Sequence, residues 1–111
     1  MECRKTFLVK GKVQGIMFRQ TVIRGAEKRG LCAGATNDPT DRSIVRFTLQ
    51  GDESLIQEIV DFMTAGKKLN SWGACVESLE ELSPSIDINA HEVTTLNVDG
   101  FKWTSGVEFF L

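Results

Sequence analysis

Stretches with the patterns of strands and helices alternate along this 111-residue chain in an order that few folds accommodate. The patterns predict strands at 6–13, 31–36, 43–50 and 74–79, and helices at 19–29 and from 52 or 54 to about 65. This strand–helix–strand–strand–helix–strand order is typical of the split β-α-β arrangement. The sequence therefore predicts an α+β, ferredoxin-like fold (βαββαβ), with an antiparallel sheet and both helices on one of its faces.

The periodicity is clearest in two of these elements. Along the strand at 43–50, Val45, Phe47 and Leu49 alternate with mostly polar residues, as in a half-buried strand. In the second helix, apolar residues recur at helical spacing and predict a buried face. Gly30 and Gly66 follow the two helices in the position that favours a helix end.

The C-terminal third of the chain is less regular. Residues 82–105 are polar and rich in turn residues, and no element is assigned to them. Val107–Leu111 alternates again, so we expect an extra C-terminal strand there. The acidic run Glu77–Glu81 is expected at a solvated strand edge. Because no repeat or linker interrupts the chain, we expect a single domain over residues 1–111.

Composition limits the possible partners and compartments. The net charge of −2 argues against broad binding to nucleic acid or to an anionic membrane. Cys3, Cys32 and Cys75 are odd in number and form no CxxC pair, which favours a reducing compartment. With no signal-like or membrane-spanning run and no heptad pattern, we expect a cytoplasmic monomer. His91 is the only histidine, and its polar neighbours predict a surface position and no zinc site.

The junction between the first strand and the first helix carries the strongest functional signal. The extended run stops at Gln14-Gly15, and Arg19 opens the helix that follows. A sharp strand-to-helix turn leaves backbone N–H groups unpaired and, with the helix dipole, creates a site for an anion. Gly15 permits a tight turn, and the guanidinium of Arg19 fits phosphate oxygens. The residues alone leave open an ordinary turn beside a solvated arginine.

The same residues also resemble a known family. Residues 11–19 read Gly-Lys-Val-Gln-Gly-Ile-Met-Phe-Arg. They closely resemble the acylphosphatase signature Gly-x-Val-Gln-Gly-Val-x-Phe-Arg, with Ile16 in place of valine. In that family an asparagine follows the arginine by eighteen positions, which matches Asn37 here. The resemblance covers roughly residues 6–80 and returns in the last residues.

The resemblance implies hydrolysis of acyl phosphates to carboxylate and inorganic phosphate, with no metal or cofactor. Arg19 would bind the phosphoryl oxygens, and Asn37 would hold the attacking water. The backbone amides of the turn would complete the phosphate cradle: Gln14, Gly15, Ile16, Met17, Phe18 and Arg19. The chemistry suits these residue types, because phosphoryl transfer depends mainly on positioning and charge stabilisation.

The chain departs from the family pattern in three places. Gly34 stands where the family typically has a tryptophan, the turn at 38–42 is longer, and residues 82–105 are unusual. A non-catalytic anion-binding or interaction domain on the same fold is therefore an alternative, with Asn37 a simple turn residue. An RNA-binding domain of similar element order is disfavoured by the absence of tyrosine and the slightly acidic charge.

Overall fold

The computed structural model describes residues 2–100 and 106–111. The elements that form the main body follow the predicted order. They are β1 (Glu2–Lys12), α1 (Phe18–Lys28), β2 (Cys32–Asn37), β3 (Ile44–Asp52), α2 (Glu53–Thr64) and β4 (Cys75–Leu82). A short strand, β5 (Val93–Thr94), and two 3-10 helices, η1 (Ile88–Ala90) and η2 (Val98–Gly100), follow.

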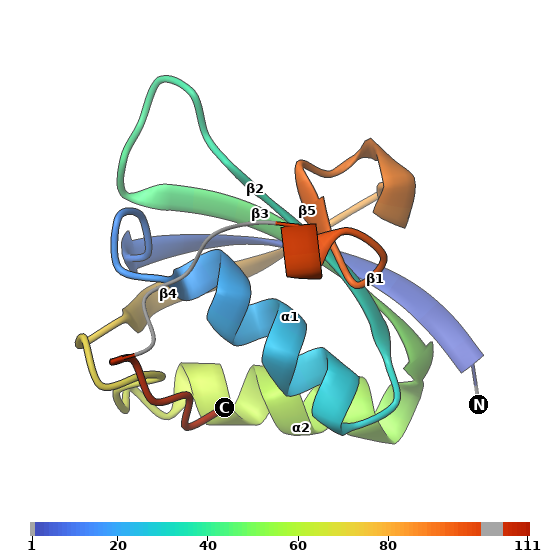
Figure 1. Cartoon of the computed structure of the whole chain (residues 1–111). Coiled ribbons are helices and arrows are strands. Elements are labelled where there is room, and N and C mark those ends of the chain that lie inside the picture. Colours follow the sequence, from blue (N-terminus) through green and yellow to red (C-terminus); the bar gives the residue numbers. More distant parts are fainter. Residues whose placement is uncertain (1, 101–105) are drawn as a thin grey trace.

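The strands form one five-stranded sheet in the order β4-β1-β3-β2-β5. Every neighbouring pair is antiparallel. Helices α1 and α2 lie together on one face of this sheet (Figure 1). The predicted ferredoxin-like α+β fold is therefore confirmed. Within residues 2–100 and 106–111, none of the helices is long and apolar enough to cross a membrane.

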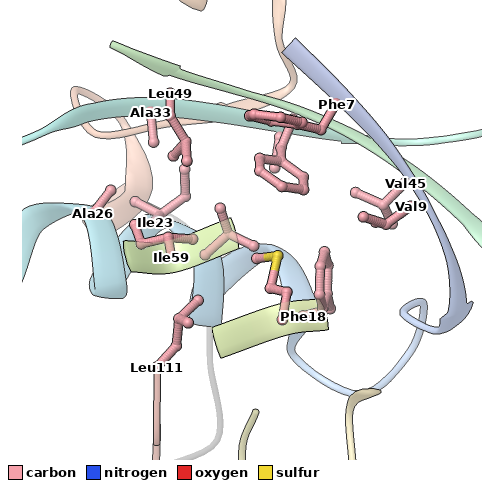
Figure 2. Packing of buried hydrophobic residues seen from close by; sticks show 14 of the residues in the cluster. Phe7, Val9, Phe18, Ile23, Ala26, Ala33, Val45, Leu49, Ile59 and Leu111 are labelled. Carbon is pink, nitrogen blue, oxygen red and sulfur yellow. The ribbon is translucent and has the colours of Figure 1, made fainter. Parts of the chain in front are cut away.

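The hydrophobic core lies between the sheet and the two helices (Figure 2). The ring of Phe47, on the central strand β3, has its centroid 5.3 Å from that of Phe7 and 6.4 Å from that of Phe18. Ile23 of α1 and Ile59 of α2 are fully buried against this layer. Phe18 is the first residue of α1, so the core itself fixes where the helix begins relative to the sheet.

The expected strand at Val107–Leu111 is not formed. Only one isolated bridge, between Asn70 and Phe109, occurs there, and Leu111 is buried against Gly25 of α1. The fifth strand is instead β5, within the region to which the sequence assigned no element; residues 101–105 of that region lie outside the described residues. The alternation in the tail reflects the burial of Val107 and Leu111, the latter against α1, not pairing in the sheet. The acidic run does lie on β4, an edge strand, as expected.

His91 is buried, not at the surface as predicted. Its side chain lies over β2 and β3, with Nε2 2.7 Å from Oγ1 of Thr48 and Nδ1 3.0 Å from Oγ1 of Thr36. Thr48 alternates with strand residues that face the helices, so it points to the opposite face of the sheet. The segment 83–100 therefore covers part of that face, and its polar composition reflects hydrogen bonds to the sheet.

The imidazole of His91 takes the space that a side chain at position 34 would need. A Cβ atom on Gly34 would lie 2.8 Å from Cβ of His91 and 2.9 Å from its Cγ and Cδ2. The absence of a side chain at this point of β2 therefore admits the histidine.

Gly34→Ala should destabilise the protein by about 1–3 kcal/mol, because the new methyl group collides with a Cβ atom that cannot move aside. Urea unfolding measures the change. Gly100→Ala is the matched control, because no atom of residues 2–100 or 106–111 outside its immediate chain neighbours lies within 4 Å of the Cβ it would add. Combining Gly34→Ala with His91→Gly, which removes Cβ as well as the ring, should cost less than the sum of the two single changes, and strict additivity would contradict the packing described here.

The stability of the fold should also fall as the pH is lowered below about 6.5. Burial lowers the pKa of His91 from its ordinary value, so the unfolded chain binds a proton more readily than the folded one. Above the pKa that His91 has in the unfolded chain, the neutral imidazole contributes its full stabilisation. Below that pKa, the free energy of unfolding falls by up to about 1.4 kcal/mol per pH unit. Because the chain has a single histidine, His91→Gln should flatten the dependence of unfolding free energy on pH between 5 and 7. Equal slopes in the two proteins would contradict this assignment.

Candidate active site

The chain between β1 and α1 forms a loop whose N–H groups are free to bind an anion. Gly15 and Met17 both adopt left-handed backbone conformations, with φ of 78° and 63°. Met17 is the N-cap of α1, and no side chain caps the helix. In the described part of the chain, the N–H groups of residues 15–20 meet no protein acceptor. The loop, with the start of α1, is therefore a cradle of donors at the positive end of a helix.

Hydrogen bonds from Asn70 and Thr21 hold two carbonyl groups of this cradle, those of Ile16 and Met17. Asn70, which is fully buried, donates from Nδ2 to the carbonyl oxygen of Ile16 at 2.8 Å and to Oγ1 of Thr21 at 2.9 Å. Thr21 in turn donates to the carbonyl oxygen of Met17 from its N–H at 3.0 Å and from Oγ1 at 2.7 Å. Asn70 was missed by the sequence analysis, because it lies in no motif and is far from the cradle along the chain.

Gln14 joins the cradle to the loop between β2 and β3. Its Nε2 lies 3.1 Å, 3.0 Å and 2.8 Å from the carbonyl oxygens of Asp38, Asp41 and Ile44. The side chain of Gln14 thus braces the loop instead of lining the cavity described below, and Ile16 is likewise absent from the lining of that cavity. For these two residues the proposed contact with a ligand would be through the backbone only.

The turn after β2 is organised around the carboxylate of Asp38. Its Oδ1 accepts from the N–H groups of Thr40 and Asp41, and its Oδ2 accepts from Nη1 of Arg46 at 2.7 Å. The Arg46 guanidinium, together with the donors of Thr40, holds the pKa of Asp38 well below its ordinary value. This long turn is therefore ordered, and it fixes the end of the strand on which Asn37 lies.

Arg19 and Asn37 meet at one cavity of about 220 Å³. Residues from the cradle, from the first turn of α1 and from the facing ends of β2 and β5 line it: Val13, Gly15, Met17, Phe18, Arg19, Gln20, Asn37 and Val93. The structure thus brings the cradle glycine, the arginine and the asparagine together from three separate elements. Val93 and Gln20 were not among the predicted site residues, since β5 is too short to show periodicity and Gln20 lies outside the motif.

Two oxygen atoms of this cavity lack hydrogen-bond partners. Among the described residues, Oδ1 of Asn37 and Oε1 of Gln20 are the buried side-chain polar atoms with no partner. Buried acceptors are nearly always paired, so each calls for a donor from outside the protein. Both atoms belong to residues of the same cavity wall, which makes this cavity suited to a ligand or water with O–H or N–H groups.

Glu92 reaches the same site and forms an ion pair with Nη1 of Arg19. The backbone N–H of Glu92 donates to Oγ1 of Thr36 at 2.9 Å, and the next residue, Val93, pairs with Ala35 in the sheet. Segment 83–100 therefore covers part of the sheet and also places the carboxylate of Glu92 against Arg19. The sequence analysis missed this contact, because nothing local to Glu92 indicates that it approaches α1.

Known proteins of one family are similar to this chain. The family model described as Acylphosphatase matches residues 5–102. The chain is 30% identical over 91 residues to an acylphosphatase of Shewanella amazonensis, covering 82% of this chain and 80% of that protein. It is 36% identical over 69 residues to an acylphosphatase of Methanococcoides burtonii, covering 62% and 69%.

Solved structures show the same likeness. The crystal structure of acylphosphatase from Bacillus subtilis superimposes with a TM-score of 0.60 at 27% identity, covering 78% of this chain and 90% of the other. An acylphosphatase from Coxiella burnetii shares the fold, with a TM-score of 0.62 at 24% identity and coverage of 78% and 83%. The family model spans most of the chain, and this chain belongs to the acylphosphatase family.

Proposed function

We propose that this protein hydrolyses acyl phosphates to a carboxylate and inorganic phosphate, and that Arg19 and Asn37 carry the reaction. The observation that supports this most directly is that Arg19, the free N–H groups of residues 15–20 and the unpartnered oxygen of Asn37 surround one cavity. Membership of the acylphosphatase family supports the same reaction class.

In this proposal the cradle binds the phosphoryl group. The phosphoryl oxygens accept hydrogen bonds from backbone N–H groups of the loop and of the start of α1. The loop residues in this proposal are Gln14, Gly15, Ile16, Met17 and Phe18. The guanidinium of Arg19 supplies the positive charge. It either leaves Glu92 for the phosphoryl oxygens or binds Glu92 and the phosphoryl oxygens together. Donors held rigidly in this way stabilise the charge that spreads over the equatorial oxygens in the transition state.

Asn37 then orients the nucleophile. Its buried Oδ1 accepts a hydrogen bond from a water molecule, whose lone pair is directed at phosphorus. The water oxygen bonds to phosphorus while the bond from phosphorus to the acyl oxygen breaks, and the electron pair leaves with the carboxylate. Because a carboxylic acid has a pKa near ~4, the leaving group needs no general acid at neutral pH.

Turnover of benzoyl phosphate by the purified protein tests this proposal. The assay contains a chelator, so that any activity observed does not depend on an added metal. Release of inorganic phosphate above the spontaneous rate supports the proposal. A folded protein that binds phosphate without turnover would contradict it and would favour a non-catalytic anion-binding domain.

We further propose that the protein acts as a monomer in the cytoplasm, on small-molecule acyl phosphates and not on nucleic acid or membranes. The three cysteines, all described and all free, support a reducing compartment.

A further inference from the structure

Gln20 is a buried polar residue of the cavity, and its side chain has no role in the mechanism above. It is the third residue of α1, directly after Arg19, and only 6% of its surface is exposed. Its Oε1 is buried and has no hydrogen-bond partner among the described residues, and Gln20 lines the same cavity as Asn37. We propose that Gln20 is a second acceptor for the attacking water and works together with Asn37; this inference rests on the proposed function.

The chemistry of the two oxygens favours water as their shared partner. Both are acceptors, so they can be satisfied only by a molecule that presents donors. A phosphoryl dianion carries acceptors alone and cannot pair with either oxygen. A water molecule has two O–H groups, one for each amide oxygen, and the cavity of about 220 Å³ is much larger than the ~30 Å³ that one water occupies.

Two acceptors also define the direction of attack. A water held by one oxygen can still rotate about that hydrogen bond, whereas a water that donates to both Asn37 and Gln20 has its lone pairs directed away from them. When the water oxygen bonds to phosphorus, the acyl carboxylate departs with the electron pair of the broken bond. The protons of the water pass to the product phosphate, so neither amide changes its protonation state.

Gln20→Met tests the proposal, because methionine has a similar length and no strong acceptor. We expect kcat for benzoyl phosphate to fall by about tenfold to a hundredfold, with the Kd for inorganic phosphate within about twofold. The thermal midpoint should stay the same or rise, since an unpartnered buried oxygen is removed. Gln57→Met, at an exposed position of α2, is the control and should change neither kcat nor the Kd.

A product ratio gives a readout that a purely structural role would not change. In water containing methanol, the enzyme can form either phosphate or methyl phosphate, and phosphorus NMR measures both. Methanol has one O–H and can satisfy only one of the two oxygens, so the wild-type protein should favour water. Gln20→Met should raise the fraction of methyl phosphate severalfold, and this ratio does not depend on how much of the protein is active.

The outcomes separate this inference from the proposed function. An active wild-type protein with unchanged kcat and product ratio in Gln20→Met would overturn the role of Gln20 alone. Parallel losses of phosphate affinity and stability in the variant would also overturn it, since Gln20 would then support the fold or the cradle. A wild-type protein that binds phosphate without turning over benzoyl phosphate would overturn both.

Discussion

Arg19→Ala should lower the turnover of benzoyl phosphate by about a thousandfold or more and abolish measurable binding of inorganic phosphate. Among the described residues that line the cavity, Arg19 is the only lysine or arginine, and the substrate's phosphoryl group carries the charge that it would bind. Removal of a single fixed donor at a transition-state oxyanion already lowers rates by about a hundred- to a thousandfold. Initial rates and calorimetric titration with phosphate measure the two effects.

The control for this variant is Arg24→Ala on the same helix. Arg24 pairs with Glu27 and Asp99, and it does not line the cavity. The substitution Arg24→Ala removes the same charge from α1. It should leave turnover within about twofold of the wild-type value, as expected for a surface ion pair outside the site. If the Arg19→Ala protein bound phosphate as tightly as the Arg24→Ala protein, the backbone cradle would bind the anion without the guanidinium, and the role of Arg19 would be wrong.

Asn37→Ala should lower kcat by about a hundredfold or more while leaving the affinity for phosphate within about threefold. The side-chain oxygen of Asn37 has no partner in the described protein, so its loss breaks no hydrogen bond of the fold. In the proposed mechanism it contacts the nucleophile and not the phosphoryl oxygens. The expected result is therefore a change in rate that is separate from binding.

Asn89→Ala provides the comparison, because Asn89 is exposed and lies in η1, outside the cavity. It should match the wild-type protein in both rate and phosphate affinity. If Asn37→Ala lost phosphate affinity and kcat to the same extent, Asn37 would be part of the anion site and the division of roles between Asn37 and Arg19 would be wrong.

The parts of the fold that sequence could predict are those whose signal is local. The alternation around Phe47 and the helical spacing around Ile59 located β3 and α2, because each element buries one continuous face. The joint role of Arg19 and Asn37 came instead from the resemblance to the acylphosphatase pattern, and the structure places both residues at one cavity.

The parts that could not be predicted depend on contacts between distant segments. Asn70 supports the cradle from the loop after α2, and Glu92 reaches Arg19 from the position just before β5, a strand of two residues. His91 has polar neighbours in the sequence, which predict exposure. It is buried because it packs on the sheet and pairs with Thr36 and Thr48, which are distant from it along the chain. The tail at 107–111 alternates as a strand does, but Leu111 is buried against α1, and periodicity does not distinguish such packing from sheet pairing.

The close fit of His91 over Gly34 constrains how this chain can diverge or be recombined with its relatives. A side chain at position 34 would collide with His91 as it is placed here, so a larger residue at position 34 requires an accompanying change at position 91. Glu92 follows His91 directly, so a displacement of His91 would also act on the carboxylate that pairs with Arg19. We therefore expect a chimaera whose imported β2 carries a side chain at position 34 to need a different segment after β4 as well.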